Sequence, residues 1–367
     1  MYWVLYSVFI FTNLFIGFGF FSLKEIKLRR MIVGISFLFF ALMIGLRPLY
    51  FPDTVAYIDI YNGLSLNERY EFSLFRAYYH NGIEYGYVFL CLLFKFLGFS
   101  ARGFFVAYSL ITTLIAHQGV KLICKEYIKP DFGGAFNSPL FLAIYASYFG
   151  FYYQTIAIRS GIAIVLGVLA LGLVMNKKYL LSGLSIFVAF TFHRMSILLL
   201  FVLLAYVFLP VFKVKKKYLY LWVILLLIYR SPIYDTLTYC SEWLIRWLLL
   251  RLNLMSAYAQ YLELGFYGGI SKKAMFYLII GLLPLIDKKI KEDGFQWKIL
   301  NIYYIGLIII PLTAAVPLAN RIFDYIMALS MIFVYLFASA DRYRSLVRFW
   351  ISIGISACYF WLVWSIV

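Results

Sequence analysis

The chain has 367 residues, of which 65% are hydrophobic, 21% aromatic and only 13% charged. Soluble domains carry about 25% charged residues, so this composition excludes an ordinary soluble protein. A transmembrane β-barrel would show short alternating segments instead of the long apolar runs present here. We therefore expect an all-α polytopic membrane protein, with Tyr and Trp side chains at both membrane interfaces.

The net charge of +17 comes from 33 basic and 16 acidic residues. We expect the excess Lys and Arg side chains to hold cytoplasmic loops against the membrane. No basic stretch interleaved with aromatic residues lies outside the apolar runs, which argues against nucleic acid as a partner. The cysteines form no Cys-x-x-Cys pair, so neither a zinc site nor a disulfide framework is predicted.

Thirteen apolar runs predict a transmembrane bundle of about 12–13 helices. The runs cover residues 2–21, 31–46, 84–98, 103–122, 138–154, 156–175, 179–192, 195–210, 217–230, 273–286, 298–316, 320–339 and 349–366. The first run lacks a basic leader and a cleavage site, which predicts a retained helix rather than a signal peptide. No internal repeat or low-complexity linker is visible, so residues 1–367 are expected to form a single integral membrane domain.

Five basic clusters between the runs predict the cytoplasmic side of the membrane. They lie at residues 24–30, 177–178, 213–217, 288–298 and 342–348. Two long segments, 47–83 and 231–272, then face outward. The second contains Trp243, Trp247 and Arg251 in a pattern typical of an amphipathic helix on the membrane surface.

The number of runs conflicts with this charge pattern. The charge pattern places both chain ends outside, whereas an odd number of crossings, such as thirteen, would place them on opposite sides of the membrane. The conflict falls between residues 84 and 159, where Lys121, Lys125 and Lys129 also favour the cytoplasm. One run in this region is therefore expected not to span the membrane. The short stretch 139–153 is our candidate for a re-entrant or broken helix, which is tolerated where backbone lines protein or a wet cavity.

Arg159 stands at the head of the run that continues to Met175. An arginine at the centre of a membrane helix costs roughly 2.5–3.5 kcal/mol on the least severe scale, so its presence needs a reason. The small residues Ser160, Gly161 and Ala163 follow it and would let a helix or a ligand approach closely.

Other polar residues share the predicted outward side with Arg159. They are Arg47, Asp53, Tyr57, His80, Glu84, His193, Arg194, Arg230, Arg321 and Asp324. Together they predict a cationic site with acids and an imidazole near the outer ends of several helices.

Simpler interpretations exist for most of these residues. Arg47, Arg194 and Arg230 lie at run ends and could be interface anchors whose side chains snorkel to the headgroups. Arg321 and Asp324, three residues apart, could form a structural ion pair.

The acid and imidazole candidates also have simpler interpretations. Glu84 could cap a helix, because the helix dipole favours an acid at the N-terminus. His193 could be a hydrogen-bonded packing residue. A neighbouring Arg194 and partial burial would keep the imidazole neutral, and a neutral imidazole can act as a base.

Several arginines at headgroup depth suit a lipid-linked pyrophosphate. Arginine is always charged and binds phosphate in bidentate geometry. Preorganised cations would stabilise a leaving lipid pyrophosphate, while an acid or imidazole activated an acceptor hydroxyl. No Asp-x-Asp pair or metal-ligand cluster is visible, so we expect no metal site and no cofactor.

Short motifs in chain order resemble the Wzy-type bacterial polysaccharide polymerases, in the branch shared with EpsG exopolysaccharide proteins. The motifs are Gly45-Leu46-Arg47, Pro52-Asp53-Thr54-Val55-Ala56-Tyr57, Glu84-Tyr85-Gly86-Tyr87, Ile158-Arg159-Ser160-Gly161, Lys177-Lys178-Tyr179, Phe192-His193-Arg194 and Asn320-Arg321. Two departures are visible. The family often has Gly-Thr-Asp at residues 51–53, which affects the turn expected at Asp53, and Arg-Gln at residues 159–160.

The resemblance implies a glycosyltransferase-C-like bundle in the bacterial cytoplasmic (inner) membrane. It implies a polymerase, active on the outer or periplasmic face, that joins undecaprenyl-pyrophosphate-linked oligosaccharides into O-antigen, capsule or exopolysaccharide. The growing chain would move to the non-reducing end of the next unit. Membrane lipids, a flippase and a chain-length regulator would be its partners.

The resemblance also implies roles for individual residues. His193, Asp53 and Arg159 are the expected catalytic residues; Arg47, Tyr57, Glu84, Arg194, Arg321 and Asp324 are the expected substrate-binding residues. Two alternatives stay open. A flippase for the same lipid-linked sugar would expose cations on both sides and often shows repeated halves. A glycan ligase would share the donor chemistry and differ only in its acceptor.

Overall fold

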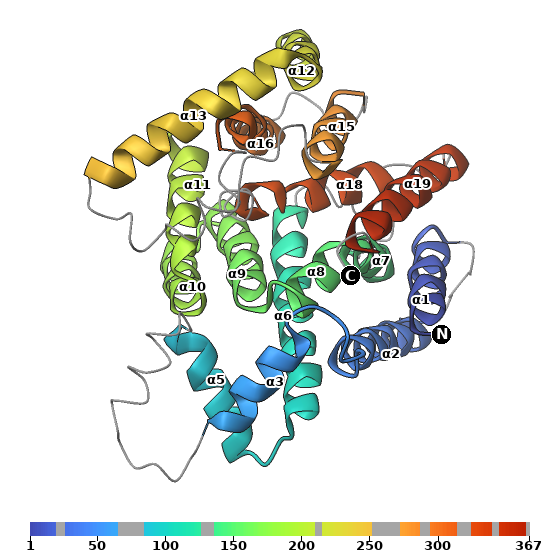
Figure 1. The fold of residues 1–367 in the computed structure, drawn as a ribbon. Helices are drawn as coiled ribbons and strands as arrows, with labels where there is room; N and C mark the ends of the chain where they lie inside the picture. Colours follow the sequence, from blue (N-terminus) through green and yellow to red (C-terminus); the bar gives the residue numbers. More distant parts are fainter. Residues whose placement is uncertain are drawn as a thin grey trace. The chain divides into compact units, whose positions relative to one another are not determined.

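The computed structural model describes residues 1–19, 26–64, 84–125, 136–209, 215–251, 272–286, 294–313, 324–339 and 345–364. Within these ranges every regular element is a helix, which confirms the all-α prediction (Figure 1). Two helices, α6 (Ala101–Ile123) and α9 (Ile158–Met175), are long and apolar enough to cross a membrane. Further apolar helices have 10–17 residues.

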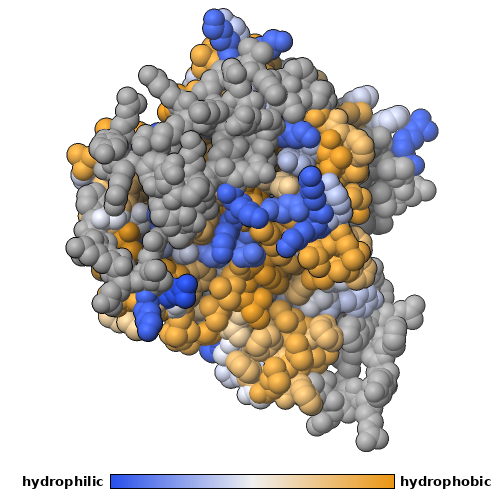
Figure 2. All heavy atoms as spheres, turned by 180° about the vertical axis from the view of Figure 1, so that it is seen from behind, coloured by the Kyte–Doolittle hydropathy of each residue, from blue (hydrophilic) through white to orange (hydrophobic). Residues whose placement is uncertain are grey.

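Large apolar side chains cover much of the protein surface. Figure 2 shows broad areas of hydrophobic residues, interrupted by smaller hydrophilic groups. Phe89, Phe187 and Leu227, for example, are each more than 60% exposed. A soluble monomer rarely exposes apolar surface on this scale, whereas a lipid-facing surface is apolar throughout. The protein is accordingly a helical membrane protein.

The described contacts divide the chain into two compact units. Unit 1 comprises residues 1–197 and 338–367, and unit 2 comprises residues 198–337. The expectation of a single domain over residues 1–367 stays a prediction.

The centre of unit 1 is a parallel pair, α6 and α9, followed by α10 (Tyr179–Phe192), which returns antiparallel to α9 (Figure 1). Tyr108 near the start of α6 donates to the carbonyl of Ile158 at the start of α9, at 2.6 Å. Near the other end, a Cβ at Gly119 would lie only 2.8 Å from the backbone nitrogen of Leu169. Glycine therefore allows these two apolar helices to approach closely.

The helices α1 (Tyr2–Gly17) and α2 (Ile26–Gly45) pack beside a helix that is broken in the middle. The break lies at Tyr148, between α7 (Ser138–Ser147) and α8 (Phe149–Thr155). Asn137 donates to the carbonyl of Gly17, and Tyr6 donates to the carbonyl of Ala146, each at 2.6 Å. The broken helix thus runs antiparallel to α1, and it delivers the chain to the end of unit 1 where α9 begins.

The segment that turns back within unit 1 is the one that carries α3 (Thr54–Gly63) and α5 (Tyr85–Phe96). These two helices lie side by side, because Lys95 donates to the carbonyl oxygens at the end of α3. Arg102 at the start of α6 donates to the carbonyl of Arg47, just beyond α2, at 2.7 Å. The twelve residues of α5 measure only about 18 Å. Both ends of α5 therefore belong to the end of the unit where α2 finishes.

This arrangement bears on the conflict in the number of runs, although which run fails to span the membrane stays a prediction. The stretch 139–153 is broken, as expected, but it runs through unit 1 instead of turning back. The run 84–98 instead begins and ends at the same end of the unit, and α6 then carries Lys121 and Lys125 to the end where Gly17 lies. The last helix of unit 1, α19 (Ser345–Trp364), packs against α1 and α7.

Unit 2 contains most of α11 (Ile197–Phe208), together with α12 (Lys215–Arg230), α13 (Pro232–Arg251), α15 (Lys272–Ile286), α16 (Gly294–Thr313) and most of α18 (Ser330–Ser339). Tyr229 of α12 donates to the carbonyl of Leu307 in α16, at 2.7 Å. The predicted helix after residue 231 is confirmed by α13, and its Trp243 is 65% exposed. Its position on the membrane surface stays a prediction.

Candidate functional site

Arg159 lies in the first turn of α9 and joins three segments of unit 1. Its guanidinium forms an ion pair with the carboxylate of Glu84. Its Nε donates to the hydroxyl of Tyr57 in α3, at 3.3 Å. The side chains of Arg159 and Glu84 remain 26% and 13% exposed. The three predicted site residues therefore meet in one partly accessible cluster, although they are far apart in the sequence.

The local packing of α8 and α9 fixes the position of Arg159. Gly161 lies against Tyr153 of α8, where an added Cβ would come within 2.6 Å of the Tyr153 Cβ. The carbonyl of Ile158 accepts the hydrogen bond from Tyr108. The first turn of α9 is thereby anchored to α6 and α8, and this leaves the arginine side chain to extend toward α3 and α5. The small residues after Arg159 serve a close helix contact, as the sequence predicted.

Glu84 precedes α5 as its N-cap residue, but its side chain makes no capping hydrogen bond. The carboxylate instead reaches Arg159, so a capping role does not account for this acid. The pairing also means that Arg159 is not merely an interface anchor. A guanidinium has five N–H donors, so the ion pair and the bond to Tyr57 do not by themselves exhaust its donor capacity.

Tyr57 is buried, and its ring contacts that of Tyr87 with centroids 5.4 Å apart. Burial raises the pKa of Tyr57, while the charge of Arg159 and the hydrogen bond from it act in the opposite direction. Burial is the larger effect, so the phenol stays protonated at neutral pH. Tyr57 can thus accept from Arg159 and donate its own proton to a further oxygen.

Asp53 occupies a left-handed backbone conformation, with φ of 60°, immediately before α3. Its side chain is exposed and makes no capping hydrogen bond. Asp tolerates this conformation better than most residues, at a cost of about 1 kcal/mol or more. The turn expected at residues 51–53 is present, because Thr54 donates its backbone N–H to the carbonyl of Phe51 at 3.2 Å. The carboxylate is close enough to Tyr57 to affect its pKa.

Arg47 is fully buried, which excludes the interface-anchor interpretation. Its Nε donates to Thr54 at 2.9 Å, its Nη1 donates to the carbonyl of Ile44 at 3.1 Å, and its guanidinium lies 4.6 Å from the centre of the Phe105 ring. Burial lowers the pKa of Arg47 to about 10, so it keeps its charge at neutral pH. These contacts hold the turn that carries Asp53 against α2 and α6.

Two further cations, outside the predicted set, complete this framework. Arg102 is bound to the carbonyl of Arg47. Lys95 donates to the carbonyls of Tyr61 and Asn62, at 3.1 and 2.9 Å, and also to that of Leu64. A cation is favoured at the C-terminal end of a helix such as α3. The sequence does contain a signal for Arg102, because this arginine stands at the head of an apolar run, as Arg159 does.

His193 ends α10 and precedes a single 3-10 turn, η3 (Arg194–Ser196). Thr191 packs directly on Gly86, two residues beyond Glu84. The η3 turn packs against α9. The half-buried imidazole therefore lies at the same end of unit 1 as Glu84 and Arg159, and the side chain of Arg194 is exposed.

Comparison with known proteins identifies the chain. The sequence profile of the EpsG family matches residues 30–367. The chain belongs to the EpsG family. This membership indicates a polysaccharide polymerase-type function in a membrane and supports the resemblance drawn from the short motifs. No curated protein and no solved structure matches the chain.

Of the remaining predicted residues of this EpsG-family protein, the structure describes Asp324. Asp324 lies in unit 2, is 2% exposed, and pairs with the ammonium of Lys273 at 2.5 Å. Tyr277 also donates to Asp324, at 3.5 Å. The described partner of Asp324 is thus Lys273, whereas Arg321 and His80 lie outside the described residues. Within the described ranges, no three His, Cys, Asp or Glu residues are grouped as metal ligands would be.

Proposed function

We propose that this EpsG-family protein is a membrane glycosyltransferase that joins undecaprenyl-pyrophosphate-linked oligosaccharide units into a longer polysaccharide. The observation that carries the proposal is the Arg159 cluster. A partly exposed guanidinium is held by Glu84 and Tyr57 at the head of an apolar helix long enough to cross a membrane. A lipid-linked pyrophosphate would lie at this depth, with its isoprenoid tail among the helices.

The chemistry of a polymerase matches the residues of the cluster. Arginine binds a pyrophosphate through parallel N–H donors, and its charge does not depend on pH. The cation would stabilise the negative charge that develops on the leaving group. Glu84 and Tyr57 hold the guanidinium in place before substrate arrives, so little reorganisation is needed during the reaction.

The proposed reaction is a single transfer. A hydroxyl at the non-reducing end of one lipid-linked unit attacks the anomeric carbon of the growing chain. The bond between that carbon and the pyrophosphate oxygen breaks, and the lipid pyrophosphate leaves with the electron pair. A base takes the proton of the attacking hydroxyl. We assign the role of this base to His193 or Asp53. Besides holding Arg159, Tyr57 and Glu84 would orient the sugar.

Orientation of the chain is part of the proposal. In unit 1, the basic residues at 27–30, at the start of α2, and at 177–178, after α9, lie at the opposite helix ends from Arg159. Positively charged loops favour the cytoplasm. We therefore place the Arg159 cluster on the outer face of the bacterial cytoplasmic membrane, where a flippase would deliver the lipid-linked units and a chain-length regulator would act on the product.

Deletion of the gene in its native strain distinguishes the proposed function from its alternatives. Loss of a polymerase should leave a surface glycan with a single repeat unit on its normal anchor, visible on a gel. Loss of a flippase would leave essentially no surface glycan. Loss of a ligase would leave polymer on the carrier lipid. Either of the last two results would contradict the proposal.

The role of Arg159 is tested by Arg159→Lys in the complemented strain. Lysine keeps the charge and loses the bidentate fork, so we expect polymerisation to fall by about 100-fold at unchanged protein abundance. Arg30→Lys is the matched control, because Arg30 is an exposed arginine near the start of α2, at the opposite helix end from the cluster. Normal chain length with Arg159→Lys would exclude arginine as the pyrophosphate ligand.

A further inference from the structure

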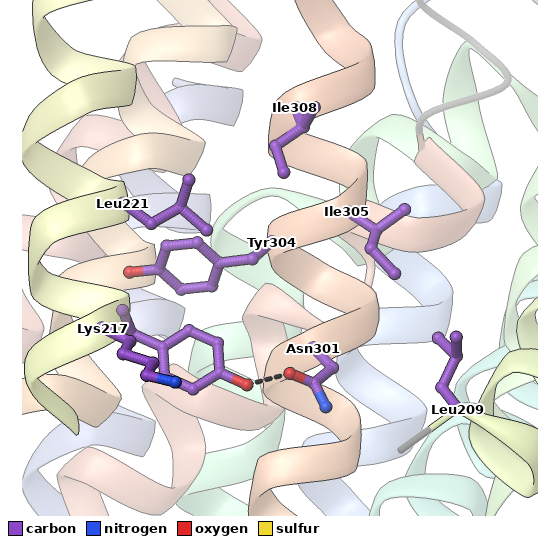
Figure 3. Close-up of a pocket in the computed structure, with 8 residues that line it drawn as sticks. Leu209, Lys217, Leu221, Asn301, Tyr304, Ile305 and Ile308 are labelled. Carbon is purple, nitrogen blue, oxygen red and sulfur yellow. Dashed lines mark hydrogen bonds between the residues drawn. The ribbon is translucent and has the colours of Figure 1, made fainter. Parts of the chain in front are cut away.

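Unit 2 contains a cavity of about 220 Å³ between α12 and α16, with Leu209 beyond the end of α11 as a third wall. The polar groups of its lining gather at one end. Figure 3 shows Lys217 and Asn301 at that end, Tyr304 and Leu221 farther along, and Ile308 beyond them. The hydroxyl of Tyr218 donates to the side-chain oxygen of Asn301. The cavity itself is thus lined almost entirely by apolar atoms, and the exposed Lys217 lies at one end of it.

The helix positions explain this polarity. Lys217 and Leu221 are four residues apart on α12 and share one face of that helix. Asn301, Tyr304, Ile305 and Ile308 follow the same spacing on α16. Along both helices a polar residue, Lys217 or Asn301, is followed by apolar residues on the same face, and this order suits a ligand with a polar head and a hydrocarbon tail.

The mouth of the cavity is electropositive. The helix α12 begins with Lys215, Lys216 and Lys217 and has no acidic residue in its first turn. The positive end of a helix dipole disfavours these cations and favours an anion. Lys298 lies nearby on α16, one turn before Asn301, with its ammonium 5.1 Å from the centre of the Tyr206 ring. An anionic group at this mouth would offset the accumulated positive charge.

We propose that this cavity binds an anionic phospholipid, with one acyl chain between α12 and α16 and the phosphate at Lys217. The apolar interior takes the hydrocarbon, and the lysines with the first turn of α12 take the phosphate. A zwitterionic lipid fits the tail equally well, but it brings no net negative charge to the mouth. The site is formed by residues of unit 2 and does not depend on the polymerase reaction.

The test uses the purified full chain in nanodiscs. One probe is phosphatidylglycerol with a photoactivatable diazirine in its acyl chain, and the other is phosphatidylcholine with the same chain. We expect phosphatidylglycerol to label the peptide around residues 300–308 at least about fivefold more strongly. Lys217→Gln should lower this labelling by about fivefold and leave the phosphatidylcholine signal unchanged.

A second variant tests the cavity itself. Ile305→Trp places a large ring in the apolar interior and should reduce labelling by about tenfold. Ile279→Trp on α15 is the matched control, because Ile279 is an exposed isoleucine outside the cavity. Equal labelling by both lipids, or full labelling of Ile305→Trp at a wild-type melting temperature, would overturn the proposal. Stronger displacement of the probe by undecaprenyl phosphate than by phosphatidylglycerol would assign the cavity to a polyprenyl lipid instead.

Discussion

The contact between Gly86 and Thr191 offers a sharp test of the site geometry. This contact joins the start of α5, where Glu84 lies, to the end of α10, where His193 lies. A Cβ at residue 86 would lie 2.8 Å from both the backbone carbon and the oxygen of Thr191. Ordinary contacts begin at 3.4 Å, so Gly86→Ala must separate the two segments by about 0.6 Å (3.4 minus 2.8).

The magnitude follows from this displacement. Overpacking of this kind costs about 1–3 kcal/mol, and the better helix propensity of alanine returns up to about 1 kcal/mol. The protein should therefore still fold. A misplacement of about 1 Å can cost 100-fold in rate, so a shift of this size between Glu84 and His193 should lower polymerisation at least about tenfold.

The assay compares glycan length, protein abundance and melting temperature for Gly86→Ala and Gly183→Ala. Gly183 also lies in α10, but a Cβ there would meet nothing within 4 Å. The control should behave as wild type or be slightly more stable. Wild-type polymerisation by Gly86→Ala would refute the view that the contact between α5 and α10 sets the geometry of the site.

Three further substitutions separate framework from chemistry. Arg47→Lys removes the hydrogen bond to Thr54 and the contact with Phe105, so we expect the free energy of unfolding to fall by about 1–3 kcal/mol. Reduced activity with an unchanged melting temperature would instead indicate a direct substrate contact. Lys95→Met removes the donor to the three carbonyls at the end of α3, so amide hydrogen exchange should become faster at residues 61–64. Unchanged protection of these amides would show that the ammonium is dispensable. Tyr57→Phe should weaken activity without shifting the pH profile of the activity between pH 6 and 9. The reason is that the raised pKa of Tyr57 keeps its phenol protonated over this range. A shifted profile would show that the phenol titrates.

The sequence predicted the helices well, because helix formation follows from local composition. Apolar periodicity marked the helices, and Lys177 and Lys178 lie at the opposite end of α9 from Arg159, whereas Lys95 lies at the same end of unit 1 as Arg47. The sequence could not show which run turns back. The runs 84–98 and 138–154 are similarly short and apolar, and only the tertiary contacts of Lys95 and Arg102 distinguish them.

The sequence pointed to Arg159, Glu84 and Tyr57 as site residues but not to the contacts among them. Arg159 was identifiable because a charge at the head of an apolar run is costly. Its pairing with Glu84 and Tyr57 depends on contacts across 75 and 102 residues of sequence, which local patterns do not encode. Arg47 resembled a surface anchor because burial of a guanidinium depends on the residues that surround it, such as Thr54 and Phe105.

Reconstitution of the purified protein tests the polymerase proposal most directly. Proteoliposomes would receive undecaprenyl-pyrophosphate-linked repeat units on the face that exposes Arg159. We predict lipid-linked chains of two or more repeats, with one undecaprenyl pyrophosphate released for each linkage formed, and loss of both products with Arg159→Lys. Movement of the units across the bilayer without any lengthening would contradict the account and identify a transporter instead.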